Sequence, residues 1–170
     1  MGLRTMKRRR KENKTDYKLR TGLLKSGIPR IVVRRTNKYF ILQAVESHEA
    51  QDKVIATITS KELLSPRDGP DGPNNGWDAK KSGSLKSIPA GYLTGLLFAK
   101  KLKSGKYIVD LGMARTESGS RVFAVVKGLI DGGLDISANE EVFPSEERLS
   151  GEHLKEDVKA MIAKVKGGLK

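Results

Sequence analysis

Arginine, lysine and tyrosine gather near the amino terminus in a pattern that suits phosphate binding. Residues 7–20 read KRRRKENKTDYKLR. A guanidinium group can donate two parallel hydrogen bonds to a phosphate, and an aromatic ring can stack on an exposed base. The contacts we predict in this segment are Lys7, Arg8, Arg9, Arg10, Lys11, Lys14, Tyr17 and Arg20. Tyr17 has an alternative role as an apolar anchor that packs the segment on the rest of the chain.

Further cations follow the first segment. Lys25, Arg30, Arg34, Arg35 and Lys38 would extend the same cationic face. Where they lie on a strand, the alternative is an ordinary solvated strand surface with alternating side chains.

Two later segments also combine features that suit RNA. Trp77 lies near Lys80 and Lys81, and an aromatic ring beside cations suits single-stranded RNA, although a tryptophan can equally fold back over the core. The amides of Ser118, Gly119 and Ser120, with Arg121 beside them, could hold a phosphate at the start of a helix. Ordinary helix capping explains these residues equally well.

The positive charge is concentrated in the first 38 residues. The 170-residue chain has a net charge of +13, of which +12 arises from 14 Lys and Arg against 2 acids in residues 1–38. A segment with so few apolar residues cannot offset its own chain entropy, so we expect it to be disordered alone and to fold on a polyanion. The alternatives are a basic run that resembles a nuclear-localisation signal, or a tail that is merely solvated. Residues 1–20 form no apolar stripe, so we expect no membrane partner.

The sequence contains few of the residues that commonly act as catalytic bases, nucleophiles or metal ligands. The chain has no cysteine and two histidines, His48 and His153, both of which we expect at the surface. Residues 112–119 match neither phosphate-loop motif. Asp110 could belong to a metal-dependent nuclease, but a strand-end cap or an ion pair is the favoured interpretation. We therefore predict no cofactor, no metal site and no small-molecule substrate.

The hydrophobic periodicity predicts an α/β fold. We expect strands over residues 31–35, 39–45 and 53–60 as a meander, with the second strand central. A long loop over 65–88 precedes a helix from Pro89 that ends at Gly105, a short strand over 107–111, and a helix capped by Ser118 that ends at Gly132. Gly91 and Gly95 would allow the first of these helices to approach the sheet. The order of elements indicates a mixed sheet covered by helices.

The predicted organisation has three parts. They are a basic arm over 1–27, an α/β core over 28–134, and an acidic tail over 135–170. The tail places Leu154, Val158, Met161, Ile162 and Val165 at helical spacing, so we expect an amphipathic helix that docks on the body or on a neighbour.

Several sequence blocks resemble one family. The segment 7–20, then LLKSGIPRIVVRRT, GW, PAGYLTGLL, DLG, SRVFAVVKGLIDGGLDI, EEVFP and GEH occur in the order and spacing of the archaeal and eukaryotic branch of the large-subunit ribosomal protein eighteen family. The segment GWDAKKSGSLKSIPAGY departs from the family pattern, and so does Met113-Ala114-Arg115-Thr116.

The resemblance implies a ribonuclease H-like fold without catalytic carboxylates, in a cytoplasmic structural protein of the large ribosomal subunit. Its implied partners are 5S rRNA, large-subunit rRNA and neighbouring ribosomal proteins, with attachment of 5S rRNA in the central protuberance as the function. It carries the 5S-binding role onto Arg8, Arg9, Arg10, Lys11, Lys14, Tyr17 and Arg20. The alternative is a non-ribosomal RNA-binding or assembly protein on the same fold.

Overall fold

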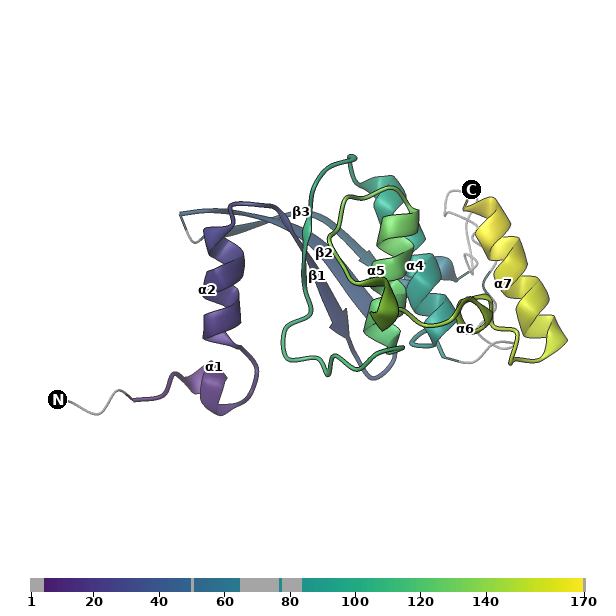
Figure 1. Ribbon diagram of the computed structural model, residues 1–170, viewed down its shortest axis with the longest axis horizontal. Coiled ribbons are helices and arrows are strands. Elements are labelled where there is room, and N and C mark those ends of the chain that lie inside the picture. The colour runs from purple at the N-terminus through teal and green to yellow at the C-terminus, as the bar shows by residue number, and fades with distance from the viewer. Residues whose placement is uncertain (1–4, 50, 65–76, 78–83, 170) are drawn as a thin grey trace.

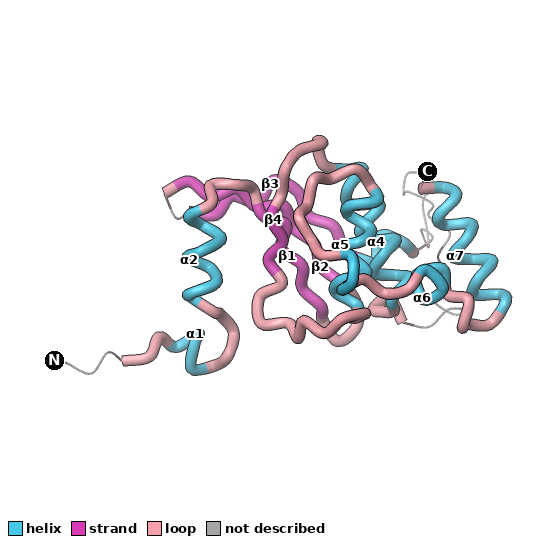
Figure 2. The backbone as a smooth tube through the Cα atoms, in the orientation of Figure 1, coloured by secondary structure: helices cyan, strands magenta, loops and turns pink. Residues whose placement is uncertain are grey.

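The computed structural model describes residues 5–49, 51–64, 77 and 84–169, and places one sheet between two groups of helices (Figures 1 and 2). The strands are β1 (Arg30–Arg35), β2 (Phe40–His48), β3 (Gln51–Thr59) and β4 (Ile108–Asp110). The helices are α1 (Arg8–Lys11), α2 (Tyr17–Lys25), α4 (Ile88–Lys101), α5 (Arg121–Asp131), α6 (Glu146–Ser150) and α7 (Glu156–Gly168), with short 3-10 turns η1 (Ser60–Leu63) and η2 (Glu140–Val142). In the described part of the chain, no helix combines the length and apolar character needed to span a membrane.

The sheet is mixed, as the sequence predicted, with the strand order β3-β2-β1-β4. The first three strands form the expected antiparallel meander, and β2 is central. The fourth strand pairs in parallel with β1, with Val32 opposite Asp110. Because side chains alternate along a strand, Ile31 and Val33 are buried on one face while Arg30, Val32 and Arg34 lie on the other.

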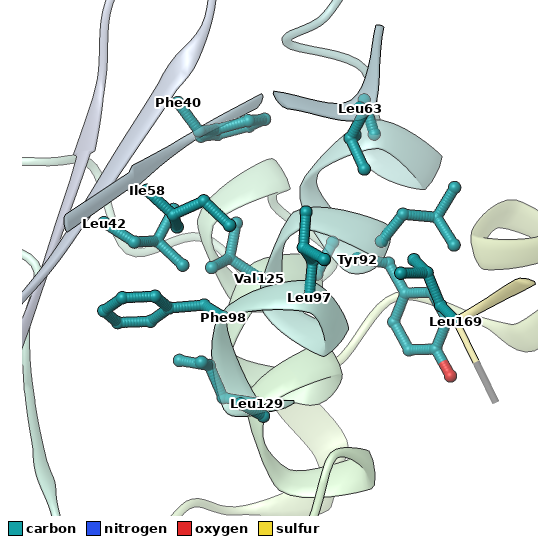
Figure 3. Packing of buried hydrophobic residues seen from close by; sticks show 14 of the residues in the cluster. Phe40, Leu42, Ile58, Leu63, Tyr92, Leu97, Phe98, Val125, Leu129 and Leu169 are labelled. Carbon is teal, nitrogen blue, oxygen red and sulfur yellow. The ribbon is translucent and has the colours of Figure 1, made fainter. Parts of the chain in front are cut away.

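Helices α4 and α5 cover one face of the sheet. Ser87 caps α4 by accepting a hydrogen bond from the Ala90 amide, and Pro89 occupies the first turn, where a missing N–H has no cost. Phe40, Leu42 and Ile58 from the sheet point toward Phe98 and Val125 of the helices (Figure 3). This apolar layer is the core of the molecule.

Glycines let α4 and α5 touch backbone to backbone. A Cβ at Gly95 would collide with the Val125 carbonyl oxygen, and a Cβ at Gly128 would collide with that of Tyr92. The expectation that Gly95 serves an approach to the sheet is therefore wrong, because its close contact is with α5. Gly91 does contact the sheet side chain Phe40, at 3.2 Å from the position of an added Cβ.

Two helix limits differ from the sequence prediction, those of α4 and α5. Helix α2 begins at Tyr17, because Asp16 accepts hydrogen bonds from the Lys18 and Leu19 amides and caps it. Helix α4 ends at Lys101 and not at Gly105. The N-cap position of α5 is occupied by Ser120 and not, as predicted, by Ser118.

The predicted C-terminal helix is confirmed and docks on the body. Val158, Met161, Ile162 and Val165 of α7 are buried. The Lys166 ammonium lies 5.4 Å from the centre of the Tyr92 ring on α4. Burial and the hydrogen bond that the Tyr92 hydroxyl donates to Asp131 both raise the pKa of Tyr92.

Candidate nucleic-acid interface

The predicted arm consists of two exposed helices. Neither α1 nor α2 has a buried residue. Within the arm, Glu12 pairs with Lys14 at 2.8 Å and with Arg8 at 3.6 Å, and Arg9 donates to the Thr15 hydroxyl at 2.9 Å. These local contacts leave the cationic side chains at the surface.

Tyr17 is half-buried at the start of α2. The Lys7 ammonium lies 4.6 Å from its ring centre, a cation–π contact that holds Lys7 near the helix. One ring face is thus in use within the arm. Both predicted roles of Tyr17, base stacking and anchoring, stay predictions.

Five cations from four segments line one hollow of about 520 Å³, which we name the cationic hollow. They are Lys14 from the arm, Arg34 and Arg35 from β1, Arg115 from the loop after β4, and Arg121 from the first turn of α5. The acid in this lining is Glu117, which pairs with Arg115 at 3.3 Å while both side chains remain largely exposed. Such an exposed pair contributes little, so the hollow remains strongly positive.

Arg34 is fixed in place at the edge of this hollow. Its guanidinium donates to the backbone oxygens of Val33 and Asp110 at 3.0 and 2.7 Å and to the Asp110 carboxylate at 3.0 Å. Gly112, at φ +61°, provides the space, because a Cβ there would lie 2.8 Å from the Arg34 Cζ. The Arg34 side chain is still 43% exposed, so part of its guanidinium faces solvent.

A smaller hollow of about 110 Å³ separates the arm from the sheet. Arg9, Lys14 and Arg20 line it from the arm side, and Arg34 and Asp110 line it from the sheet side. The arm therefore lies over the sheet face opposite to α4 and α5, which we name the open face and which carries Arg30, Val32, Arg34, Ile41 and Gln43.

Several of the groups predicted to hold a phosphate at the start of α5 make contacts within the protein. The Ser118 hydroxyl donates to the Glu141 carbonyl oxygen, and the Ser120 hydroxyl oxygen is buried. The amides of Gly119 and Ser120 donate to the carbonyl oxygens of Val142 and Glu117. These groups are engaged within the protein or shielded, which leaves Arg121 as the exposed cation at this helix start.

Arg30, predicted as an RNA contact, is buried. Its side chain is 3% exposed, and it donates to Asp52 at 2.7 Å and to Ser47 at 3.1 Å. A buried guanidinium that is paired with carboxylates is a structural group. Sequence alone could not reveal this, because Asp52 belongs to a different strand.

Trp77 covers the core and cannot stack on RNA in this structure. It is 2% exposed, and its amide donates to the Leu63 carbonyl oxygen at 3.1 Å. The alternative of a tryptophan folding back is therefore the correct one. Lys80 and Lys81, predicted beside it, lie outside the described residues.

The other predicted cations, Lys25, Arg35 and Lys38, are exposed. Lys25 lies in the last turn of α2, where a cation complements the helix dipole. Arg115 was missing from the predicted set, although its place between a strand and a helix start was a signal that could have identified it.

Asp110 is an ion-pair partner, as favoured from the sequence. Its carboxylate contacts Arg34 at 3.0 Å and Arg30 at 3.7 Å, and accepts from the Gly112 amide at 2.8 Å. Across the described ranges, no group of three or more His, Cys, Asp or Glu could hold a metal ion. His48 and His153 are exposed, as expected.

Comparison with known proteins agrees with a ribosomal protein. The family model described as "Ribosomal large subunit proteins 60S L5, and 50S L18" matches residues 3–107 and 101–139. The large ribosomal subunit protein uL18 of Methanoculleus marisnigri is 44% identical over 152 residues, covering 88% of this chain and 79% of the relative. Those of Methanoregula boonei and Korarchaeum cryptofilum are 43% and 42% identical, each over 86% of this chain and over 79% and 70% of the relative.

Proposed function

The chain belongs to the family of large-subunit ribosomal proteins that includes uL18, and from this premise we propose that it binds 5S rRNA and attaches it to the large-subunit rRNA in the central protuberance. Family membership makes the chain a structural constituent of the cytoplasmic ribosome and not an enzyme. The proposal concerns its RNA partner and the surface that binds it.

The observation that carries the proposal is the cationic hollow. Lys14, Arg34, Arg35, Arg115 and Arg121 come from four segments and face one concave surface beside the basic arm. A run of arginines on a flexible tail binds any polyanion. Cations fixed around a concave surface instead favour a backbone of defined curvature, and RNA is recognised largely by such shape and by its phosphates.

The described arm and the hollow would act together. Exposed Arg8, Arg9, Arg10 and Lys11 of α1 would supply charge for association, and the cations of the hollow would supply charge on a concave surface for selectivity. Neighbouring ribosomal proteins would contact the remaining surface, including the acidic tail. The organisation into an arm over 1–27, a core over 28–134 and a tail over 135–170 is part of this proposal.

The test compares 5S rRNA with tRNA as ligands across a salt series of about 50 to 200 mM. A variant with Arg35, Arg115 and Arg121 replaced by Gln loses three exposed cations of the hollow, none of which belongs to the buried core. If each contributes about 1 kcal/mol, affinity for 5S rRNA falls roughly 100-fold, and the slope of log affinity against log salt falls by about three.

A matched control removes the same charge elsewhere. Replacing Lys155, Lys159 and Lys164 on or beside α7 with Gln changes the net charge equally, but on a helix at the opposite end of the molecule from α1 and α2 (Figure 1). We expect its effect on 5S binding to be small. Two outcomes would refute the proposal and identify a generic polyanion binder. The first is an equal loss of affinity for 5S rRNA in the two variants, and the second is equal affinity of the wild-type chain for 5S rRNA and tRNA.

A further inference from the structure

Five residues of alternating charge cross the open face, and we name them the charge chain. They are Arg20 of α2, Asp52 of β3, Arg30 of β1, Asp110 of β4 and Arg34 of β1. The successive distances between their charged groups are 2.7, 2.7, 3.7 and 3.0 Å. The charge chain thus connects the arm to the cationic hollow through the carboxylates of Asp52 and Asp110.

The first contact of the charge chain attaches the arm to the sheet. Helix α2 has no fully buried residue, whereas α7 buries four, so less apolar packing holds α2 than holds α7. Among the described residues, the ion pair that joins α2 to the sheet is the one between Arg20 and Asp52, in which Arg20 Nη2 lies 2.7 Å from Asp52 Oδ2. The position of α2 therefore depends on this contact more than on packing.

Asp52 is well prepared for this role. Its Oδ1 accepts from the Ser47 hydroxyl at 2.6 Å and from Arg30 at 2.7 Å, while Oδ2 accepts from Arg20. Partial burial alone would raise the pKa of Asp52, but the Ser47 hydrogen bond and the charges of Arg30 and Arg20 outweigh it and lower the pKa. The carboxylate is consequently ionised at neutral pH.

Arg20 and Arg34 are each held by a carboxylate, and each still has an exposed part of its guanidinium that is available to RNA. Each side chain is 43% exposed although it is paired with a carboxylate. A guanidinium presents several N–H groups in a planar fork, so one edge can contact a carboxylate while another contacts a phosphate. Holding a long side chain in its bound orientation lowers the entropy lost on binding.

We propose that Asp52 is a positioning residue for rRNA binding, which orients Arg20 and holds α2 over the open face so that the arm and the cationic hollow form one binding surface. The inference rests on the proposed function, and it assigns an acidic residue a favourable role in binding a polyanion. Arg30, which is buried and does not contact RNA in this proposal, links Asp52 to Asp110, and Asp110 in turn holds Arg34.

The sign of one substitution tests this role. Asp52→Asn removes a negative charge from a cationic face, so charge alone predicts tighter RNA binding. Loss of positioning predicts the opposite. We expect the affinity for 5S rRNA to fall about fivefold, the scale of one partly exposed ion pair, and the preference for 5S rRNA over tRNA to decrease.

Glu49→Gln is the matched control. Glu49 lies in the same hairpin as Asp52 and gives the same charge change, and no ion pair joins it to the arm among the described residues. We expect this variant to bind as tightly as the wild type or slightly more tightly. Asp52→Glu, which restores the carboxylate, should recover part of the lost affinity and selectivity.

The decisive result is the comparison of Asp52→Asn with Glu49→Gln in the full chain. Affinity that is unchanged or increased in both variants would overturn the inference while leaving the proposed function intact. A wild-type chain without preference for 5S rRNA would instead overturn the proposed function, and this inference with it.

A second variant covers the case in which Asp52→Asn does not fold, because Arg30 would lose a buried partner. Arg20→Lys preserves the charge and leaves the Asp52–Arg30 pair intact, but removes the planar fork. We expect it to lower 5S affinity about fivefold with an unchanged thermal midpoint. Unchanged affinity in Arg20→Lys would also overturn the inference.

Discussion

The two helical regions on either side of the sheet are held by different forces. Helices α4 and α5 pack on the sheet through fully buried side chains such as Phe98, Leu93 and Val125, and their backbones touch at glycines. Helices α1 and α2 on the opposite side bury no residue and are held by polar contacts such as Arg20 with Asp52. We therefore expect the folding free energy to come mainly from the first region, and under the proposed function the free energy of RNA binding to come mainly from the second.

This difference means that substitutions should separate stability from RNA affinity. A change in the α4–α5 layer should lower the free energy of unfolding and leave the affinity of the folded protein unaltered. A change in the arm should do the reverse. If the two properties change together in both regions, the separation is wrong.

The largest effect is expected in the apolar layer. Phe98→Ala removes a fully buried ring that faces the sheet, and leaves a cavity among well-packed neighbours (Figure 3). The free energy of unfolding should fall by about 3–5 kcal/mol, as measured by denaturant titration. Phe98→Leu, which keeps most of the volume, should cost much less.

RNA titration at a temperature where Phe98→Ala is folded provides the other half of this test. Its 5S affinity should match that of the wild type, because residue 98 lies on the face of the sheet opposite to the arm. A parallel loss of affinity in the folded variant would mean that the helical layer shapes the binding surface.

The next effect concerns the arm. Arg8, Arg9 and Arg10 are exposed and belong to a helix with no buried residue. Their replacement with Ala should weaken 5S binding by roughly 100-fold, at about 1 kcal/mol per lost contact, and should flatten the salt dependence. The thermal midpoint should not decrease, because removal of clustered like charges relieves repulsion.

Isothermal titration across a salt series, together with thermal unfolding, would measure both properties on one preparation. Unchanged affinity and salt slope would exclude the arm as a binding element. A large decrease in the midpoint would show that α1 contributes to the fold, contrary to its lack of burial.

The sequence predicted the helical layer better than the binding surface. The spacing of apolar residues predicted β1 to β3, α4, α5 and α7. This signal is local, because the residues on the buried face of one helix or strand recur at a regular spacing along the sequence. The mixed sheet and the central position of β2 followed from the same signal. Local patterns of this kind need no knowledge of distant partners.

The binding surface depends on contacts between distant segments. Arg30 resembles its neighbours Arg34 and Arg35 in the sequence, yet it is buried because Asp52 and Asp110 converge on it from other strands. Trp77 is also buried, and its amide donates a hydrogen bond to the carbonyl oxygen of Leu63, which lies in a separate segment. Residue type alone distinguished neither a structural cation from an exposed one nor a core aromatic from an RNA-stacking one.

The smallest expected effect tests how closely α4 and α5 approach each other. A Cβ at Gly128 would meet the Tyr92 carbonyl oxygen, so Gly128→Ala must separate the two helices. Overpacking of this kind costs about 1–3 kcal/mol, and the helix propensity of Ala returns up to about 1 kcal/mol. The free energy of unfolding should thus decrease modestly.

Gly167→Ala in α7 separates the propensity gain from the steric cost. An added Cβ at Gly167 meets no atom within 4 Å, so the same substitution there should raise the free energy of unfolding by up to about 1 kcal/mol. Opposite signs at the two glycines, measured by denaturant titration, would establish that backbone contact between α4 and α5 requires Gly128. A stabilising effect at both positions would mean that the helices separate at little cost, and that the apolar side chains alone hold this layer together.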